Sequence, residues 1–201
     1  MTEPRWLTRA LGPAPYACAA LNVAAAVALA TVMRPGTELG GSPTARHAYM
    51  AAHPLLWRGG WVLWMAASAS LVAFYLWWAL RLARRTLALA LWAVALAGFA
   101  LDLTAEILLA ARVPDNLALA PVAAALTGVG ANGLYTVAGA GLSLLMRVRG
   151  RFAVWTWTMW AAGAGLSIFT FLGVFAGSAA CTAVLFALFC PWVVAVRFRL
   201  G

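Results

Sequence analysis

Long apolar runs, separated by short polar segments, dominate the chain. The runs cover approximately residues 13–33, 55–80, 87–111, 117–146, 152–176 and 179–196. Each is close to or above the roughly 20 residues that a helix needs to cross a bilayer. The pattern therefore predicts an all-α polytopic membrane protein. We expect a bundle of six transmembrane helices that forms a single transmembrane domain over residues 1–201.

The polar segments refine this plan. Residues 34–54 are rich in Gly, Pro, Ser and Thr, and Ser42-Pro43 is typical of a helix N-cap followed by proline at the first helical position. A short surface helix over residues 43–53 is expected there. Pro191 should kink or break the last helix. Ala28-Leu29-Ala30 resembles a signal-peptidase site, but the first apolar run is longer than the 7–15 residues of a signal core, which favours a retained helix.

Composition supports the membrane class: 65% of the residues are hydrophobic and 9% are charged, against about 25% charged in soluble domains. The net charge of +9 comes from arginines clustered between apolar runs, which argues against nucleic-acid binding. Since the chain contains no lysine, Schiff-base chemistry is excluded. An Ala- and Arg-rich, Lys-free composition is typical of GC-rich bacterial genomes, so we expect a multi-pass protein of the bacterial cytoplasmic (inner) membrane.

The arginines also predict an orientation. With six spans, one side of the membrane holds most of them, and the positive-inside rule makes that side cytoplasmic. Both termini are then cytoplasmic, and the 34–54 loop is extracytoplasmic. The cytoplasmic set comprises Arg5, Arg9, Arg81, Arg84, Arg85, Arg147, Arg149, Arg151, Arg197 and Arg199.

Asp102 and Glu106 lie inside the third apolar run. Their i, i+4 spacing places both on one helix face. An ionisable group at membrane depth costs roughly 2.5–3.5 kcal/mol on insertion scales, so it is by default a candidate functional site. If the chain is an enzyme, these two carboxyl groups are the candidate catalytic acid and base.

Depth along neighbouring helices predicts partners for the carboxylates. The helices on either side of the Arg81–Arg85 turn are expected to be antiparallel, so residues equally far from the turn lie at the same depth. This places Arg58 level with Glu106, and Trp64 level with Asp102. An Arg58–Glu106 ion pair could simply join two helices, and it would leave Asp102 without a counter-charge. Asp102 would then carry a proton, hold a cation or accept from a neutral donor. Counting across the next turn supplies three such donors: Thr127, Asn132 and Tyr135.

Tryptophans give the region a further feature. Trp57, Trp61 and Trp64 form a stripe on one helix face, and a pocket of acids and aromatic rings would suit a cationic or lipophilic ligand through cation–π attraction. Simple packing is the alternative reading of the stripe. Interfacial anchoring is expected for the tryptophans nearer the cytoplasm: Trp77, Trp78, Trp92, Trp155, Trp157, Trp160 and Trp192.

His47 and His53 lie near the outer mouth of the expected site. With Asp102 and Glu106 they could form a His/carboxylate metal set, although their spacing matches no known ligand motif. The sequence therefore leaves a metal, and any other cofactor, unidentified.

Three classes of function fit these residues. The first is a membrane protein that binds a cation, a proton or a lipophilic ligand at Asp102, Glu106, Arg58, Trp61, Trp64, Asn132 and Tyr135. The second is an intramembrane enzyme that modifies a lipid or isoprenoid with Asp102 and Glu106 as acid and base. The third is a non-catalytic regulatory or assembly subunit that binds a partner membrane protein through its basic edges or its Gly-rich fourth helix. The sequence alone leaves catalysis undecided.

Overall fold

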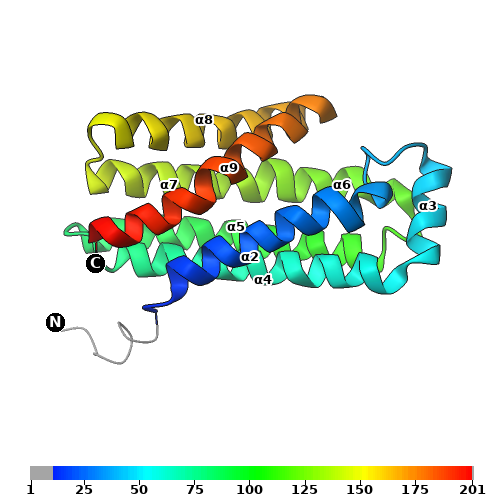
Figure 1. The fold of residues 1–201 in the computed structure, drawn as a ribbon, viewed down its shortest axis with the longest axis horizontal. Helices are drawn as coiled ribbons and strands as arrows, with labels where there is room; N and C mark the ends of the chain where they lie inside the picture. The colour runs from blue at the N-terminus through cyan, green and yellow to red at the C-terminus, as the bar shows by residue number, and fades with distance from the viewer. Residues whose placement is uncertain (1–10, 201) are drawn as a thin grey trace.

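A computed structural model describes residues 11–200, and the regular structure of this range is entirely helical. The long helices lie side by side along one axis (Figure 1). The first half of the described chain contains α2, which continues through the π-helical η1 and the 3₁₀ η2, and then α3, α4 and α5. Their bounds are α2 Ala14–Ala28, η1 Leu29–Met33, η2 Arg34–Gly36, α3 Pro43–Ala52, α4 Pro54–Ala79 and α5 Arg85–Ala111.

The second half begins with one long composite helix. A 3₁₀ turn (η3) leads into a short α-helix (α6), a π-helical stretch (η4) and then α7. Two further long helices, α8 and α9, complete the chain. The bounds are η3 Leu117–Leu119, α6 Ala120–Ala124, η4 Ala125–Ala131, α7 Asn132–Met146, α8 Gly150–Phe171 and α9 Phe175–Leu200.

The six long helices form a closed ring in the order α2, α4, α5, α7, α8 and α9. Each packs mainly against its two neighbours, and α2 closes the ring by packing between α4 and α9. The short helix α3 lies across one end of the bundle (Figure 1). The opposite end carries Arg81, Arg84, Arg147, Arg149, Arg197 and Arg199. We call these the α3 end and the arginine-rich end.

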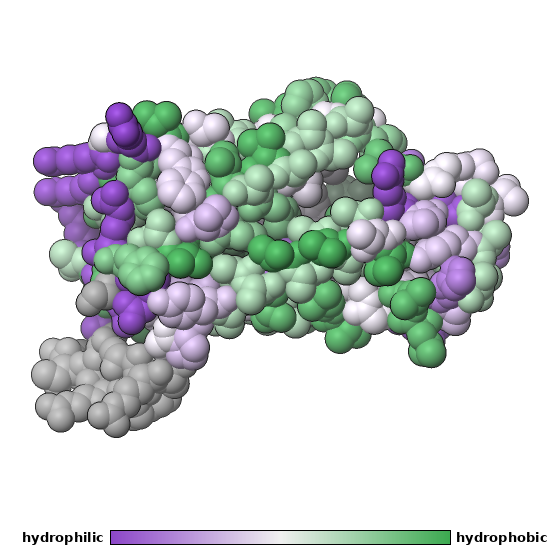
Figure 2. Space-filling view, viewed as in Figure 1, coloured by the Kyte–Doolittle hydropathy of each residue, from purple (hydrophilic) through white to green (hydrophobic). Residues whose placement is uncertain are grey.

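Five helical segments of the described chain are long and apolar enough to cross a membrane: Ala14–Gly36, Pro54–Ala79, Arg85–Ala111, Leu117–Met146 and Phe175–Leu200. The predicted fifth span corresponds to α8, which is absent from this set. Its tryptophans and threonines, including Trp155, Thr156 and Trp157, lower its hydropathy. In the bundle α8 nevertheless runs beside α7 and α9. Apolar side chains cover the middle of the molecule, and polar ones gather at both ends (Figure 2).

Two local expectations hold. The α3 helix begins at Pro43, and the Ser42 side chain accepts a hydrogen bond from the Ala45 amide at 3.3 Å, so Ser42 is the N-cap. The first apolar run is helical from Ala14 to Gly36. Arg5 and Arg9, which contributed to the orientation argument, lie outside the described residues.

The turn between the last two helices differs from expectation. The sequence suggested Gly177-Ser178, but α8 ends at Phe171 and α9 begins at Phe175. Gly173 adopts a left-handed conformation with φ of +69°, which glycine tolerates and which ends α8. Gly177 instead lies in the first turn of α9, where an added Cβ would be 2.7 Å from the Phe169 ring.

Of the kink or break expected at Pro191, the break does not occur: α9 continues through Pro191 to Leu200. The flanking residues Cys190, Trp192 and Val193 are buried and hold this part of the helix against its neighbours. Packing therefore offsets the hydrogen bond that proline removes.

Four of the tryptophans expected at the interface lie instead in the core. Trp77, Trp78 and Trp192 are fully buried, and Trp160 is 5% exposed. The Trp78 and Trp192 rings pack edge to face at 5.2 Å, and Trp160 contacts Trp192 at 5.7 Å. Together with Phe74 and Phe152 they form an aromatic core in the half of the bundle nearer the arginine-rich end. The belt prediction failed because depth alone does not show which side of a helix a residue occupies.

Candidate functional site

The helix α5 directs Asp102 and Glu106 into the bundle. Asp102 is 7% exposed and Glu106 is 1% exposed, so both carboxyl groups are buried on the same helix face, as their spacing predicted. Both lie in the half of α5 nearer the α3 end. The aromatic core lies toward the arginine-rich end of the bundle. A second apolar cluster, which includes Met33, Met50 and Trp57, lies toward the α3 end.

Ser68 on α4 joins the two acids. Its hydroxyl donates to Asp102 Oδ2 at 2.7 Å, and the same oxygen lies 3.1 Å from Glu106 Oε1. A serine hydroxyl has one hydrogen and can donate it to only one acceptor at a time. If Ser68 donates to Asp102, its second contact is a hydrogen bond only when Glu106 carries a proton and donates it to Ser68.

Two further hydroxyl groups converge on Asp102 from the neighbouring composite helix. Thr127 Oγ1 donates to Asp102 Oδ1 at 2.5 Å, and the Tyr135 hydroxyl donates to Oδ2 at 3.3 Å. Asp102 therefore accepts from three neutral donors on the two helices that flank α5, the arrangement that suits an ionised carboxylate.

The backbone that supplies Thr127 is itself unusual. Thr127 lies within η4, a π-helical stretch in the middle of a membrane-length helix. Such stretches are rare, and they often occur at functional sites because they change which side chains face the interior. Thr127 lies within this stretch, and Tyr135 lies in the first turn of α7 directly after it. The hydroxyl groups of both residues contact the carboxyl group of Asp102.

Glu106 is less well satisfied than Asp102. Its Oε2 atom is buried and has no hydrogen-bond partner, and the same holds for Nε1 of Trp61 and of Trp64. A buried polar atom without a partner costs about 1–3 kcal/mol. A proton on Glu106 removes the charge that makes this position expensive.

The predicted Arg58–Glu106 ion pair is absent. Arg58 is exposed on α4, while Trp57 and Trp61 occupy the inward face at this level. No arginine or histidine within residues 11–200 forms an ion pair with Asp102 or Glu106. Arg58 faces away from the acids, so the structure does not bring it into the site.

Asn132 also points elsewhere. Its side-chain amide donates to the Gly163 carbonyl at 2.7 Å and to Ser167 Oγ at 2.8 Å, which links α7 to α8. Of the donors that the sequence offered for Asp102, Thr127 and Tyr135 make the contact and Asn132 does not.

The tryptophan stripe does face the interior near the acids. Trp57 Nε1 donates to the Leu109 carbonyl at 2.7 Å, which satisfies an otherwise open carbonyl in the last turn of α5. The Trp57 and Trp61 rings meet edge to face at 5.5 Å, and Trp64 meets Phe186 of α9 at the same distance. The stripe packs, as the simpler reading expected, and it also lines the α4 side of the site.

Ser68 is the functional candidate that the sequence reasoning missed. It continues the inward stripe of Trp57, Trp61 and Trp64 by one more step of four residues, and that spacing could have identified it.

The histidines do not join the acids. His47 and His53 are exposed at the α3 end, and His53 packs its ring against Tyr49 at 4.9 Å. Residues 11–200 contain no group of three or more His, Cys, Asp or Glu side chains arranged to hold a metal ion.

Comparison with protein-family models, with curated proteins and with solved structures finds no match to this chain. The fold and the site together describe an all-helical protein with five helices fit to span a membrane and a buried Asp102/Glu106 polar network.

Proposed function

We propose that this chain is a multi-pass membrane protein that binds a proton within the membrane, with Glu106 as the group that carries it. The observation that supports the proposal is the single hydroxyl of Ser68 between two carboxyl groups. Asp102 has three donors and is the fixed anion. Glu106 donates its proton to Ser68 Oγ, so the pair carries one negative charge in place of two.

Charge accounting favours a proton over a structural ion pair. Within the described residues, no basic side chain reaches either acid, and every donor to Asp102 is a neutral hydroxyl. Two adjacent unpaired anions in an apolar interior would repel each other and lose their hydration. Asp102 is 7% exposed and Glu106 is 1% exposed, and this burial suits an occupant as small as a proton.

The proposed topology is six spans with the arginine-rich end in the cytoplasm, and α8 as the fifth of the six. The clustering of arginines at one end supports it. A bacterial cytoplasmic membrane is the proposed location, because the composition fits a GC-rich bacterial genome. Glu106 then exchanges its proton with the extracytoplasmic side, because it lies in the half of α5 nearer the α3 end.

Infrared difference spectroscopy of the purified protein in lipid nanodiscs tests this assignment. The expected result is a protonated-carboxyl C=O band at neutral pH that shifts in D₂O, disappears in Glu106→Gln and survives in Asp115→Asn, a matched loss of an exposed acid. Absence of the band in the unmodified protein, or its survival in Glu106→Gln, overturns the proposal.

Native mass spectrometry of the same preparations separates the alternatives. A bound metal or alkali cation that is lost in Glu106→Gln would replace the proton with a cation as the ligand. A co-purified partner protein, together with no effect of Glu106→Gln on the infrared band, would favour the subunit class instead.

A further inference from the structure

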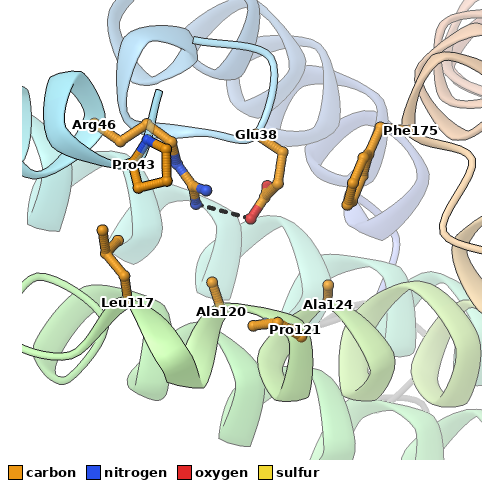
Figure 3. Close-up of a pocket in the computed structure, with 8 residues that line it drawn as sticks. All are labelled: Glu38, Pro43, Arg46, Leu117, Ala120, Pro121, Ala124 and Phe175. Atoms are coloured by element: carbon orange, nitrogen blue, oxygen red, sulfur yellow. Dashed lines mark hydrogen bonds and ion pairs between the residues drawn. The ribbon is translucent and has the colours of Figure 1, made fainter. Parts of the chain in front are cut away.

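A pocket of about 320 Å³ opens at the α3 end of the bundle, away from Asp102 and Glu106 (Figure 3). One wall carries the ion pair between Arg46 of α3 and Glu38, whose Nη2 and Oε1 atoms are 2.8 Å apart. The floor is apolar and comes from the first turns of the composite helix, through Leu117, Ala120, Pro121 and Ala124. Phe175, the first residue of α9, closes one side.

Arg46 and Glu38, which form the charged wall of the pocket, still have hydrogen-bonding groups available for a ligand. Arg46 uses two of its five N–H groups within the described chain, Nε to the Gly36 carbonyl and Nη2 to Glu38. Three N–H groups therefore remain for an anion. Glu38 uses Oε1, so Oε2 remains for a cation. The Arg46 side chain is only 12% exposed and that of Glu38 is 32% exposed, which fixes a positive and a negative group side by side in a recess.

The pocket lies at the boundary of the membrane-length helices. Its floor contains the start of the Leu117–Met146 segment, and Phe175 begins the Phe175–Leu200 segment. The turn beside it, Leu172-Gly173-Val174, has no polar side chain, and Phe171, Leu172 and Val174 are 76%, 61% and 44% exposed. An apolar surface therefore continues from the pocket into the region where acyl chains lie.

We infer that this pocket binds the phosphoethanolamine headgroup of a phospholipid. The phosphate accepts from Arg46, the ammonium group donates to Glu38, and the acyl chains leave over the apolar α8–α9 turn. Arg46 suits a phosphate because its planar guanidinium offers paired donors. A headgroup with a phosphate and no cation would place its negative charge beside Glu38 without compensation. A cavity of about 320 Å³ has room for several water-sized groups, and therefore for a small headgroup such as phosphoethanolamine.

The inference is independent of the proton site, because the two share no residue. Native mass spectrometry tests it on delipidated protein in detergent, supplied with equal amounts of phosphatidylethanolamine and phosphatidylglycerol. The unmodified protein should retain phosphatidylethanolamine in preference. Arg46→Gln should reduce that retention about tenfold, which corresponds to about 1.4 kcal/mol.

Glu38→Gln provides the decisive second variant, because it keeps the phosphate ligand and removes only the partner of the ammonium group. It should retain both lipids about equally. Arg34→Gln is the matched control: Arg34 is exposed, follows η1 at the same end and does not line the pocket, so it should behave as the unmodified protein. A thermal midpoint close to that of the unmodified protein checks that each variant is folded.

Free glycerophosphoethanolamine distinguishes a lipid from a soluble zwitterion. Weak or absent binding of this headgroup alone is expected, because the acyl chains contribute through the apolar turn. Binding as tight as that of the lipid would assign the pocket to a soluble zwitterion and overturn the lipid assignment. Unchanged lipid retention and selectivity in both Arg46→Gln and Glu38→Gln would overturn the site itself.

Discussion

At the scale of single residues, Ser68 is central to the site because it contacts both buried acids. Ser68 is small and neutral, yet its hydroxyl oxygen lies within hydrogen-bond distance of two buried acids. Because it can serve only one of them as a donor, it makes the two carboxyl groups unequal. Asp102 accepts hydrogen bonds from three hydroxyl groups, and the proposed function assigns the proton of the pair to Glu106.

Ser68→Ala should therefore destabilise the bundle. Hydrogen bonds between helices in membranes contribute about 0.6 kcal/mol on average and up to about 1.7 kcal/mol, so a loss in this range is expected. Reversible unfolding in mixed detergent micelles measures it. Thr104→Val is the control, since the exposed Thr104 hydroxyl bonds to the Ala100 carbonyl within its own helix. Equal losses in the two variants would contradict a special role for Ser68.

Arg58 and Glu106 should prove energetically independent. Arg58 is exposed and makes no ion pair with Glu106. A double-mutant cycle with Arg58→Ala and Glu106→Gln should be additive within about 0.3–0.5 kcal/mol of unfolding free energy. A coupling energy well above this range would restore the ion pair that the sequence suggested.

At this site the sequence predicted the depth of a residue in the membrane better than the side of the helix on which the residue lies. Counting along antiparallel helices correctly brought Thr127 and Tyr135 to Asp102. The same counting also offered Arg58, which is exposed, and Asn132, which instead bonds to α8. Depth follows from the rise per residue, whereas the facing direction depends on how each helix is rotated by packing, and that information is distributed over the whole bundle.

At the scale of elements, small residues allow the helices to approach the aromatic core. Gly139 on α7 is the clearest case: a Cβ there would be 2.2 Å from the Trp160 ring and 2.6 Å from the Tyr75 hydroxyl. Trp160 is in turn fixed by its hydrogen bond to Ser143 at 2.8 Å. The glycine-rich fourth run thus packs against aromatic rings in its own bundle.

Gly139→Ala should lower the unfolding free energy by about 1–3 kcal/mol, the range for overpacking a well-filled core. Thermal unfolding followed by intrinsic tryptophan fluorescence measures this change. Gly59→Ala is the matched control in a helix, because no atom lies within 4 Å of its added Cβ. That control should be neutral or slightly stabilising, since alanine has the higher helix propensity. If both variants behave alike, the contact with Trp160 is not a constraint.

The pattern of apolar residues predicts where the long helices lie, but it does not predict irregularities of their backbone. Apolar runs located every long helix to within a few residues, because length and apolarity are local properties. The π-helical stretch at Ala125–Ala131 and the turn at Gly173 were not predicted. Both depend on contacts with neighbouring helices: Ser167 bonds to the Gly128 carbonyl within the π-helical stretch, and Phe169 packs against Gly177 beyond the turn.

At the scale of the whole molecule, the number of spans depends on whether α8 crosses the membrane. This number determines the side on which the end of α9 lies. Six spans place the C-terminus on the same side as the Arg81–Arg85 turn, whereas five spans without α8 place it on the opposite side. The ring supports six, because α8 lies between α7 and α9 along the bundle.

Reporter fusions measure this difference directly. A cytoplasm-active reporter should be active after Arg84 and after Leu200, and inactive after Glu38. Activity after Arg84 combined with inactivity after Leu200 would show that α8 does not cross. Activity after Glu38 alone would reverse the orientation.

The order in which the partners of Asp102 occur along the chain has a consequence for biosynthesis. Ser68 precedes Asp102 by 34 residues, whereas Thr127 and Tyr135 follow it by 25 and 33. At about 5–20 residues per second, the ribosome needs about 1–5 seconds after Asp102 to reach Thr127. During that interval α5 has only α4 to shelter its acids. We expect the α4–α5 hairpin to enter the bilayer as one unit, with Ser68 as the first partner that Asp102 meets.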